Sequence, residues 1–421
     1  MNAPGDSRIP SRGPTMPIAA PTPPFALHPQ AIRIASEAEA VRIARDLATE
    51  FAAGAAERDR DRRLPVPELD RFSGSGLWGI TVPAAYGGLG ASFVTVGEVI
   101  ALVSAADPSL GQIPQNHLAA LDVIRVTASE EQKRLWFGRA LRGYRLGNAF
   151  SERNSRHVGA FETTLRRDGE HFVVEGDKFY ATGALFAHFI HIGAVDPEGR
   201  VHFAIADRDA PGLTITDSWS GFGQRTTASG DVTLRGVRVA PEAVIPAWRG
   251  GEAPSSNGAV SQFIQAAVDL GIARGARDET IRFVRTRARP WIDSGRAQAT
   301  EDVLTIHQVG DLTVKLRAAE AMLARAGRAI DAILDAPTDA AVTETAVAVA
   351  EAKVLTTEIA LLAADKLHEL SGTRSVLAAD NLDRHWRNAR THTLHDPVRW
   401  KSFHVGNHAL NGIAPPRHAW S

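Results

Sequence analysis

The sequence predicts an α+β protein in which an N-terminal helical domain, a central antiparallel β domain and a C-terminal four-helix bundle follow one another. Apolar residues recur every three or four positions within residues 29–145 and again after residue 250, which is the period of an amphipathic helix. Residues 146–250 instead contain short β-rich runs that Gly, Asp and Pro interrupt, as antiparallel strands do. Because strands and helices do not alternate, we do not expect a doubly wound parallel sheet.

The composition excludes several classes of protein. The 421 residues carry 47 Lys and Arg against 48 Asp and Glu, a net charge of −1, so nothing attracts the chain to nucleic acid or to an anionic membrane. The chain has no cysteine, which excludes disulfides, thiolate metal ligands and cysteine nucleophiles. No apolar run approaches the roughly 20 residues of a transmembrane helix. We therefore expect a cytoplasmic protein.

The first segment, residues 1–28, is expected to be a disordered arm. It consists mainly of Pro, Ala, Ser, Gly and Thr, a composition that cannot form a packed core. Pro21, Pro23 and Pro24 favour extended backbone. The segment also lacks the apolar centre of a signal peptide.

The N-terminal helical domain is predicted over residues 29–145, with helices over 31–62 and 91–107. Between them, Gly74, Gly76 and Gly79 form a GxGxxG pattern. A dinucleotide fingerprint needs a strand before this pattern and a helix after it. A polar helical segment precedes the pattern and a proline follows it. We therefore expect Gly76 to end the preceding helix.

The central β domain is predicted over residues 146–250. Its runs of Val, Ile, Thr, Phe and Tyr, bounded by turn residues, predict strands within residues 171–183, 200–209, 213–219 and 229–241.

The C-terminal bundle with its tail is predicted over residues 251–421. One apolar stripe is formed by Val309, Leu312, Leu316, Ala319, Leu323, Ala326, Ile330 and Ile333. A second is formed by Leu355, Ile359, Leu362 and Leu370. Long antiparallel helices with such stripes pack as a bundle.

Five motifs, in this order, resemble the acyl-CoA dehydrogenase superfamily. They are TVPAAYGGLGA (81–91), AFSERNS (149–155), GDKFYATGA (176–184), GVRVAP (236–241) and RTRARPW (285–291). The resemblance covers about residues 30–412 and implies the acyl-CoA dehydrogenase fold.

The chain departs from the dehydrogenases of that superfamily near its end. Where they carry a Glu-Gly pair near the thioester, this chain has Asp396-Pro397, preceded by His392 and His395. Aspartate is one methylene shorter than glutamate, and a misplacement of about 1 Å can cost roughly 100-fold in rate. The segment DRHWRNARTHTLHDP is similar instead to the flavin-dependent monooxygenase branch. That branch includes the dibenzothiophene monooxygenases and the sulfur-acquisition oxidoreductases of dimethyl sulfone utilisation.

The resemblance implies a two-component monooxygenase. Such an enzyme takes reduced FMN (FMNH2) from a separate NAD(P)H-dependent flavin reductase, with FAD less expected. It oxidises a small organosulfur compound, a sulfone or sulfide, with O2 through a flavin C4a-hydroperoxide, and the sulfur is then assimilated. The protein must supply a dry pocket with a few fixed polar groups. The family and the striped helices together imply a homotetramer.

Two histidines are the first candidate catalytic residues. Because His392 and His395 are three positions apart, we expect them on one helix face. Imidazole can donate a hydrogen bond or carry a proton near neutral pH, and the resemblance favours His395 as the catalytic group with His392 in support. Structural histidines inside the bundle are the alternative. A metal site would need a third ligand, so no metal is expected.

The remaining candidates rest on the resemblance. Thr182, with Tyr180 beside it and Ser229, is implied to contact the flavin; Asn148 and His117 are implied catalytic residues, and Trp219 a wall of the substrate cavity. Arg287 and Arg374, with Gly372, are implied to anchor a flavin that a neighbouring subunit partly holds, since Arg suits phosphate. Each candidate also has a structural alternative. Thr182 could simply favour a strand, Asn148 could close a turn, and Asn116 beside His117 could cap a helix. Trp219 could fill the space between the β domain and the bundle, and the two arginines could form surface ion pairs.

Two other functions stay open. The first is an FAD-dependent acyl-CoA dehydrogenase with Asp396 as its base. The second is a non-catalytic flavin-binding protein that has kept the fold.

Overall fold

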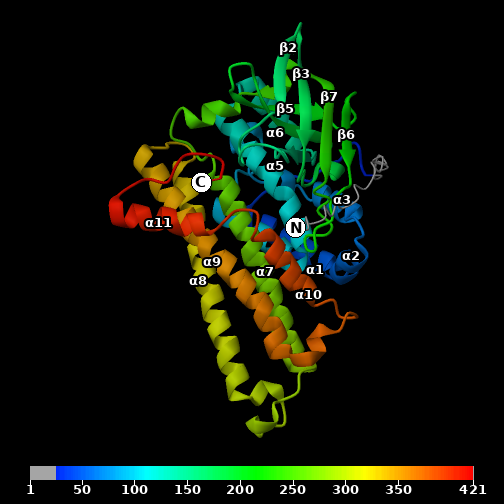
Figure 1. Cartoon of the computed structure of the whole chain (residues 1–421), viewed down its shortest axis with the longest axis vertical. Helices are drawn as coiled ribbons and strands as arrows, with labels where there is room; N and C mark the ends of the chain where they lie inside the picture. The colour runs from blue at the N-terminus through cyan, green and yellow to red at the C-terminus, as the bar shows by residue number, and fades with distance from the viewer. Residues whose placement is uncertain (1–24, 421) are drawn as a thin grey trace, which may run out of the picture.

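The N-terminal region consists of six helices. The computed structural model describes residues 25–420, so residues 1–24 of the predicted arm lie outside the described residues. Phe25, within that predicted arm, is buried with its ring edge-on to His188, the ring centroids 5.1 Å apart. The helices are α1 (Glu37–Ala52), α2 (Ala55–Asp61), α3 (Val66–Gly74), α4 (Phe93–Ala106), α5 (Pro108–Thr127) and α6 (Glu130–Ala140), shown in Figure 1.

The GxGxxG pattern ends a helix, as the sequence predicts. Helix α3 ends at Gly74, and Gly76 follows with φ +81°, the left-handed conformation that favours glycine. A Cβ at Gly76 would lie 2.5 Å from the carbonyl oxygen of Ile32. The pattern therefore serves chain reversal and close packing.

The central region is one eight-stranded sheet in the order β6-β7-β3-β2-β4-β5-β8, with β1 beside β4. Most pairs are antiparallel, as expected, but β1 and β2 each pair with β4 in parallel. The strands are β1 (Leu146–Ala149), β2 (Thr164–Asp168), β3 (His171–Lys178), β4 (Phe189–Val195), β5 (Val201–Asp207), β6 (Leu213–Thr216), β7 (Asp231–Val239) and β8 (Val244–Ile245).

The central strand β4 is absent from the strands that the sequence predicts. Residues Phe189–Ala194 of this strand are all buried, and a continuous apolar run lacks the alternation that identifies a half-buried strand. Its register places His191 directly beside Asn148 of β1. The missed strand therefore places a histidine next to Asn148, a predicted site residue.

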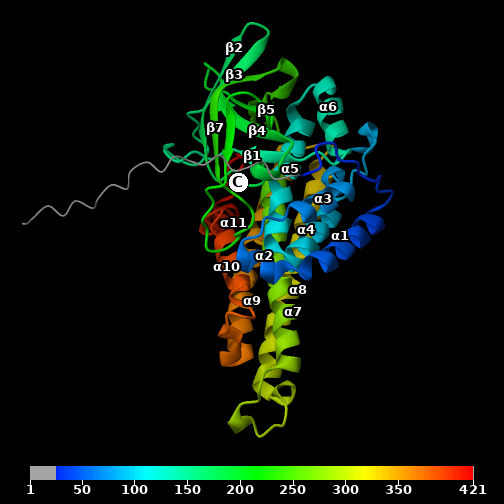
Figure 2. The same cartoon turned by 90° about the vertical axis from the view of Figure 1, so that its right-hand side faces the viewer.

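The C-terminal region is a bundle of long helices with two shorter ones. The predicted stripe on α8 is confirmed, because Leu312, Leu316, Leu323 and Ile330 are buried. Helix α10 lies against α7 and α9, as Figures 1 and 2 show. The helices are α7 (Ala259–Thr286), α8 (Val303–Ile333), α9 (Asp339–Ser371), α10 (Asp383–His392) and α11 (Arg399–Asn411).

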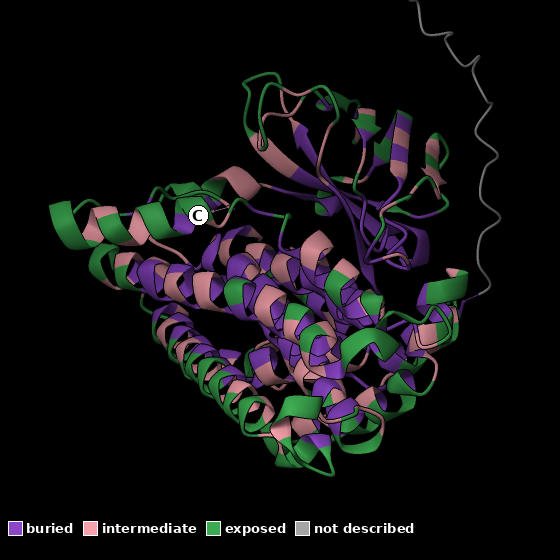
Figure 3. Ribbon diagram, turned by 60° about the horizontal axis from the view of Figure 1, so that its bottom comes forward, coloured by how far each residue is buried: buried purple, intermediate pink, exposed green. Residues whose placement is uncertain are grey.

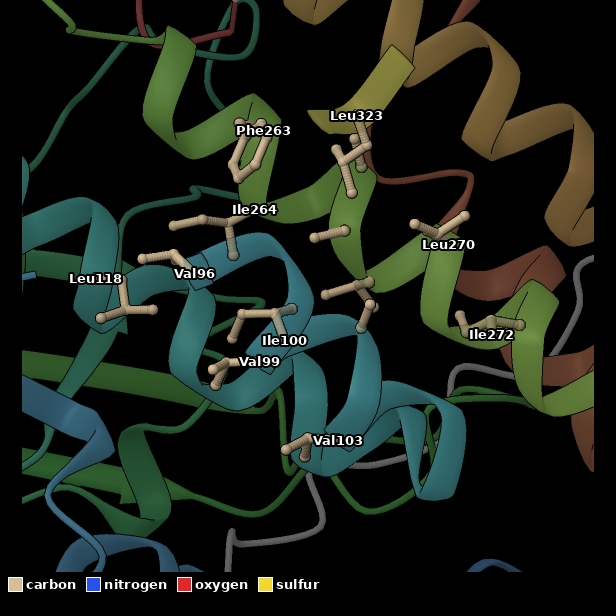
Figure 4. Packing of buried hydrophobic residues seen from close by; sticks show 14 of the residues in the cluster. Val96, Val99, Ile100, Val103, Leu118, Phe263, Ile264, Leu270, Ile272 and Leu323 are labelled. Atoms are coloured by element: carbon tan, nitrogen blue, oxygen red, sulfur yellow. The ribbon is translucent and has the colours of Figure 1, made fainter. Parts of the chain in front are cut away.

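The N-terminal helices and the bundle share one core. Val96 and Ile100 of α4 pack with Phe263 and Ile264 of α7 in a single cluster of buried residues (Figure 4). In Figure 3 the bundle helices bury one side and expose the other, as amphipathic helices do. No helix among residues 25–420 has the length and hydropathy of a membrane span. The shared core fixes α5 and α7 relative to each other.

His117 joins three elements of this frame. Helix α5 begins at Pro108, capped by Asp107, so His117 lies in mid-helix, and the alternative of a helix cap at Asn116 was wrong. The Nε2–H of His117 donates to the carbonyl of Trp78 at 2.9 Å, and its Nδ1 accepts from the N–H of Leu146 at 3.1 Å. Burial lowers the pKa of His117 to about 3. Both ring nitrogens are therefore used within the fold.

This histidine makes the stability of the protein depend on pH. Its folded pKa lies below the unfolded value of 6.5, so its contribution is present above pH 6.5 and is lost as the pH falls toward the folded pKa. The loss is about 1.4 kcal/mol per pH unit in that window. His117→Gln is expected to lower stability at about pH 8 but to reduce the further loss on acidification. Urea unfolding at about pH 8 and pH 5 measures this, with the exposed His171→Gln as control; an unchanged acid loss in His117→Gln contradicts it.

Candidate active site

A cavity of about 580 Å³ lies where the sheet meets α5 and α7, a volume typical of a site for a cofactor or small ligand. Its wall combines aromatic and polar side chains. The Phe, Tyr and Trp side chains of the wall are Phe150, Tyr180, Phe203, Trp219, Phe222 and Trp420. Helices α5 and α7 contribute the carboxamides of Gln112, Gln115, Asn116, Gln262 and Gln265.

The structure brings together most of the predicted site residues on this wall. They come from four segments that are far apart in the chain. They are Asn148, Tyr180, Thr182, Trp219, Ser229, His392 and His395. His117 does not line the cavity, which agrees with its hydrogen bonds to the frame.

A chain of three hydroxyl groups runs from the cavity into the protein. Strand β3 ends at Lys178, so Thr182 lies in the following turn, and its expected place on the strand was wrong. The Thr182 and Ser229 hydroxyl oxygens are 2.7 Å apart, and Ser229 lies 2.8 Å from Thr227. Thr227 donates to the carbonyl of Gln224 at 3.0 Å. Because Thr227 uses its own proton there, the others donate along the chain, and Thr182 Oγ1 keeps its lone pairs for a ligand.

Trp219 forms one wall of the cavity and is held by its own loop. Its Nε1–H donates to the carbonyl of Gln224 at 2.8 Å. A Cβ at Gly221 would lie 2.2 Å from the Trp219 ring, so the indole position requires glycine there. The loop is tied to α10, since the N–H of Gln224 donates to Asn388 at 2.7 Å. Trp219 therefore follows the position of α10.

His392 is the most enclosed candidate catalytic group. Its Nδ1 lies 2.5 Å from Oδ1 of Asp269, and Oδ2 of Asp269 accepts from Lys353 at 2.8 Å and from Thr357 at 3.1 Å. All four side chains are buried. Burial raises the pKa of Asp269, but Lys353 and His392 outweigh it and lower the value to about 2. Burial lowers the pKa of His392 despite the carboxylate beside it.

His395 lies beside His392 through a turn. Helix α10 ends at His392, so the expectation that both share a helix face was wrong. The N–H of His395 bonds to the carbonyl of His392 at 3.0 Å. Its Nδ1 lies 3.0 Å from Nε2 of Gln265 and 3.4 Å from Oδ2 of Asp396. The side chain is 38% exposed, so His395 can exchange protons with water and His392 cannot.

Several buried polar atoms of the wall have no hydrogen-bond partner in the protein. They are Gln112 Oε1, His191 Nδ1, Gln224 Oε1 and Nε2, Gln262 Oε1, Gln265 Oε1, Thr391 Oγ1 and His392 Nε2. Buried polar groups are nearly always paired, so these atoms indicate a polar ligand. Burial lowers the pKa of His191 to about 4, which keeps its ring neutral.

Sequence reasoning missed much of this wall, including the glutamines of α5 and α7, His191 and Trp420. His191 was missed because its strand, β4, was not predicted. Trp420 comes from the tail that follows α11, and its carbonyl accepts a hydrogen bond from Lys401 at 2.7 Å. No local pattern indicates that the last residues return to a cavity.

Arg287, Gly372 and Arg374 lie away from this cavity. Arg287 follows the C-terminal end of α7, whereas the cavity lies at the N-terminal end, roughly 30 Å along the helix. Arg287 forms an ion pair with Asp380 at 2.7 and 2.8 Å, and Arg374 donates to the carbonyl of Arg287 at 3.0 Å. Gly372 begins the adjacent short helix. The three residues therefore form one cluster, and this cluster is separate from the cavity of the same chain.

Comparisons with known proteins agree with this architecture. Residues 36–144, 148–237 and 263–400 match the N-terminal, middle and C-terminal domains of acyl-CoA dehydrogenase. The chain is 36% identical over 403 residues to dibenzothiophene monooxygenase of Rhodococcus erythropolis, covering 91% of this chain and 96% of the relative. It is 31% identical to the "Probable FMNH2-dependent monooxygenase SfnC" of Pseudomonas putida, covering 89% and 96%.

A solved structure gives the same result in three dimensions. FMN-bound TdsC from Paenibacillus sp. A11-2 superposes with a TM-score of 0.86 at 32% identity, covering 91% of this chain and all of the other. Sequence and structure comparisons thus agree over nearly the whole chain. The chain belongs to the acyl-CoA dehydrogenase superfamily and, within it, to the branch of flavin-dependent monooxygenases that includes dibenzothiophene monooxygenase.

Proposed function

We propose that the protein is a two-component monooxygenase that oxidises a small organosulfur compound, a sulfone or sulfide, for sulfur acquisition. It uses O2 and reduced FMN from an NAD(P)H-dependent reductase, which associates with it transiently in the cytoplasm. In the balanced reaction, substrate, O2 and FMNH2 give oxygenated product, water and FMN. The observation that carries the proposal is the buried His392, a residue of the cavity wall whose Nε2 has no hydrogen-bond partner in the protein.

The carboxylates near the cavity argue against an acyl-CoA dehydrogenase, which needs a free base. Asp396 does not line the cavity, and its Oδ2 accepts from Gln262 at 3.2 Å. Asp122 does line it, but its oxygens accept from Arg125 and Ser256 at 2.8–2.9 Å. Among residues 25–420, each acidic side chain near the wall is thus already committed. The FAD-dependent dehydrogenase with Asp396 as base is the weaker alternative.

The unpartnered wall atoms and the directed hydroxyl chain fit a flavin ring, which has an apolar face and a polar edge. Thr182, with Ser229 behind it, would accept from that edge, Asn148 would contact it, and Tyr180 and Trp219 would cover the ring. When bound, reduced FMN would supply the two electrons that activate O2. The carboxamide nitrogens of Gln262 and Gln265 contact Asp396 and His395, so the second N–H of each carboxamide would donate to a sulfone oxygen on the opposite side.

The two histidines divide the proton chemistry. His395, partly exposed and hydrogen-bonded to Gln265, exchanges protons with solvent and delivers them to the reacting oxygen. His392, fully buried, supplies a fixed polar contact without admitting water. Excluding water is what protects a reactive oxygen species from wasteful decay.

The chain is proposed to assemble as a homotetramer in which Arg287, Gly372 and Arg374 reach the flavin of a neighbouring subunit. The support is their distance from their own cavity and the exposed apolar side chains on α8 and α11. Those side chains are Val303, Leu304, Ile306, Val314, Trp400, Phe403 and Leu410, and the exposed Ile413 follows α11. Light scattering at micromolar concentration is expected to give a tetramer mass, and Arg287→Ala to weaken FMN binding with the fold kept. A monomer mass contradicts the assembly.

Reduced FMN is expected to bind more tightly than oxidised FMN, so the protein should purify nearly colourless. The reduced ring carries an additional N–H, and Thr182 Oγ1 has lone pairs free to accept one. One net hydrogen bond corresponds to about 2- to 10-fold in affinity. Anaerobic titration of both flavin forms measures the preference, with Thr182→Val expected to reduce it. Stoichiometric, tightly held FAD in the purified protein would count against the proposal.

His395→Ala is expected to lower product formation by about 100- to 10,000-fold, the range for a lost general acid or base. Folding and FMN binding should be kept, and the consumed FMNH2 should appear as hydrogen peroxide. Asp396→Asn should cost less, because that carboxylate lies behind His395. Product and peroxide per FMNH2 are measured for both variants at one pH. If Asp396→Asn abolishes turnover while His395→Ala resembles wild type, the assigned roles are wrong.

A further inference from the structure

A buried charge cluster behind the cavity connects three helices. Asp269 of α7 contacts Lys353 of α9 and His392 at the end of α10. We infer that Asp269 and Lys353 are positioning residues that together keep His392, a residue of the cavity wall, neutral, with its proton on Nδ1 and a free lone pair on the opposite nitrogen, Nε2.

The carboxylate fixes which nitrogen carries the proton. An ionised carboxylate can only accept hydrogen bonds, so Nδ1 of His392, 2.5 Å from Oδ1 of Asp269, must donate. The opposite nitrogen, Nε2, is buried without a protein partner. The Asp269 contact therefore selects one of the two tautomers and one ring orientation.

Lys353 determines the charge of that imidazole. Its ammonium group lies 2.8 Å from Oδ2 of Asp269, and both side chains are almost completely buried. An unpaired buried carboxylate would hold a second proton on the adjacent histidine. Because the Lys353 charge already balances Asp269, His392 gains little by protonation and pays the cost of a buried cation. Burial correspondingly lowers the pKa of His392.

Among the other charged groups around His392, His395 also lowers the pKa of His392 and so acts in the same direction as Lys353. Asp396, in the turn after α10, lies 3.4 Å from Nδ1 of His395 and accepts from Gln262. Lys401 of α11 donates to the carbonyl of Trp420. From the packed helices α7 and α9, the groups that act on the imidazole are Asp269 and Lys353. Lys353 is therefore the cation whose removal should change the charge of His392.

A neutral His392 gives the site a hydrogen-bond acceptor at Nε2, whereas a protonated His392 ring would offer only a donor there. Resting on the proposed function, this acceptor favours reduced FMN, whose ring carries the additional N–H. Asp269 and Lys353 would then contribute to the choice of flavin redox state without touching the flavin.

The test measures the flavin-free protein, so it does not depend on turnover. Lys353→Met removes the charge but keeps the length of the side chain. It is compared with wild type, each with and without His392→Gln, by urea unfolding at about pH 8 and pH 5.5. The control is Lys178→Met, since Lys178 is equally buried in an ion pair with Glu152 at 2.6 Å and does not contact His392.

Lys353→Met should reverse the sign of the contribution that His392 makes to the loss of stability at acid pH. In wild type, the folded pKa lies below the unfolded value, so His392 lowers stability as the pH falls, by up to about tenfold in the unfolding constant per pH unit. His392→Gln should therefore reduce the acid loss in wild type and in Lys178→Met. In Lys353→Met the ring should pair with Asp269 as a cation, and His392→Gln should increase the acid loss.

Two results would overturn the inference. One is that His392→Gln still reduces the acid loss of stability in folded Lys353→Met. The other needs only wild type and His392→Gln: if the substitution increases the acid loss there, His392 is already protonated in the native protein. In a separate measurement, Lys353→Met should lower the preference for reduced over oxidised FMN at about pH 6. If the unfolding result holds and this preference is unaffected, the positioning role stands and the flavin assignment fails.

Discussion

The carboxylate of Asp269 is the contact on which the geometry of the cavity depends. It accepts from His392, Lys353 and Thr357, and so holds the end of α10 to the middle of α7 and α9 without exposure to water. Breaking a buried pair of this kind costs several kcal/mol, because the remaining charge has no partner. The cluster therefore fixes the end of α10, and with it the Trp219 loop that Asn388 of α10 holds.

The cavity lies where three regions of the chain meet, and each contributes a different property. The sheet supplies a directed hydroxyl chain that ends at Thr182. Helices α5 and α7 supply carboxamides with unpartnered oxygens. The segment after α10 supplies two histidines in different environments, one buried and one partly exposed. Where the dehydrogenases of the superfamily carry a glutamate, this chain carries Asp396, which accepts from Gln262, with two imidazoles nearby. Under the proposed function, this arrangement favours oxygen chemistry over proton abstraction.

Much of the fold follows from local patterns, and much of the site does not. The α8 stripe and the helix end at Gly76 were predicted because periodicity and glycine act over a few residues. Strand β4 and its His191 were missed because a continuous apolar run has no diagnostic period. The resemblance implied a catalytic role for His117, but its position in the middle of α5 directs both ring nitrogens to hydrogen bonds within the fold.

The Asp269 cluster was not predicted at all, because its contacts span 84 and 123 residues. A signal was present nonetheless. Asp269 and Lys353 are single charges in otherwise apolar helix faces, and an isolated charge on a buried face requires a partner.

The most direct test of the account follows the oxygen atom. The protein is loaded with reduced FMN and given a small sulfone and isotopically labelled O2, and the product is analysed by mass spectrometry. The account predicts one labelled oxygen atom in each product molecule, with the second recovered as water. Product without label, or complete recovery of the label as hydrogen peroxide with a range of small sulfones and sulfides, would contradict it.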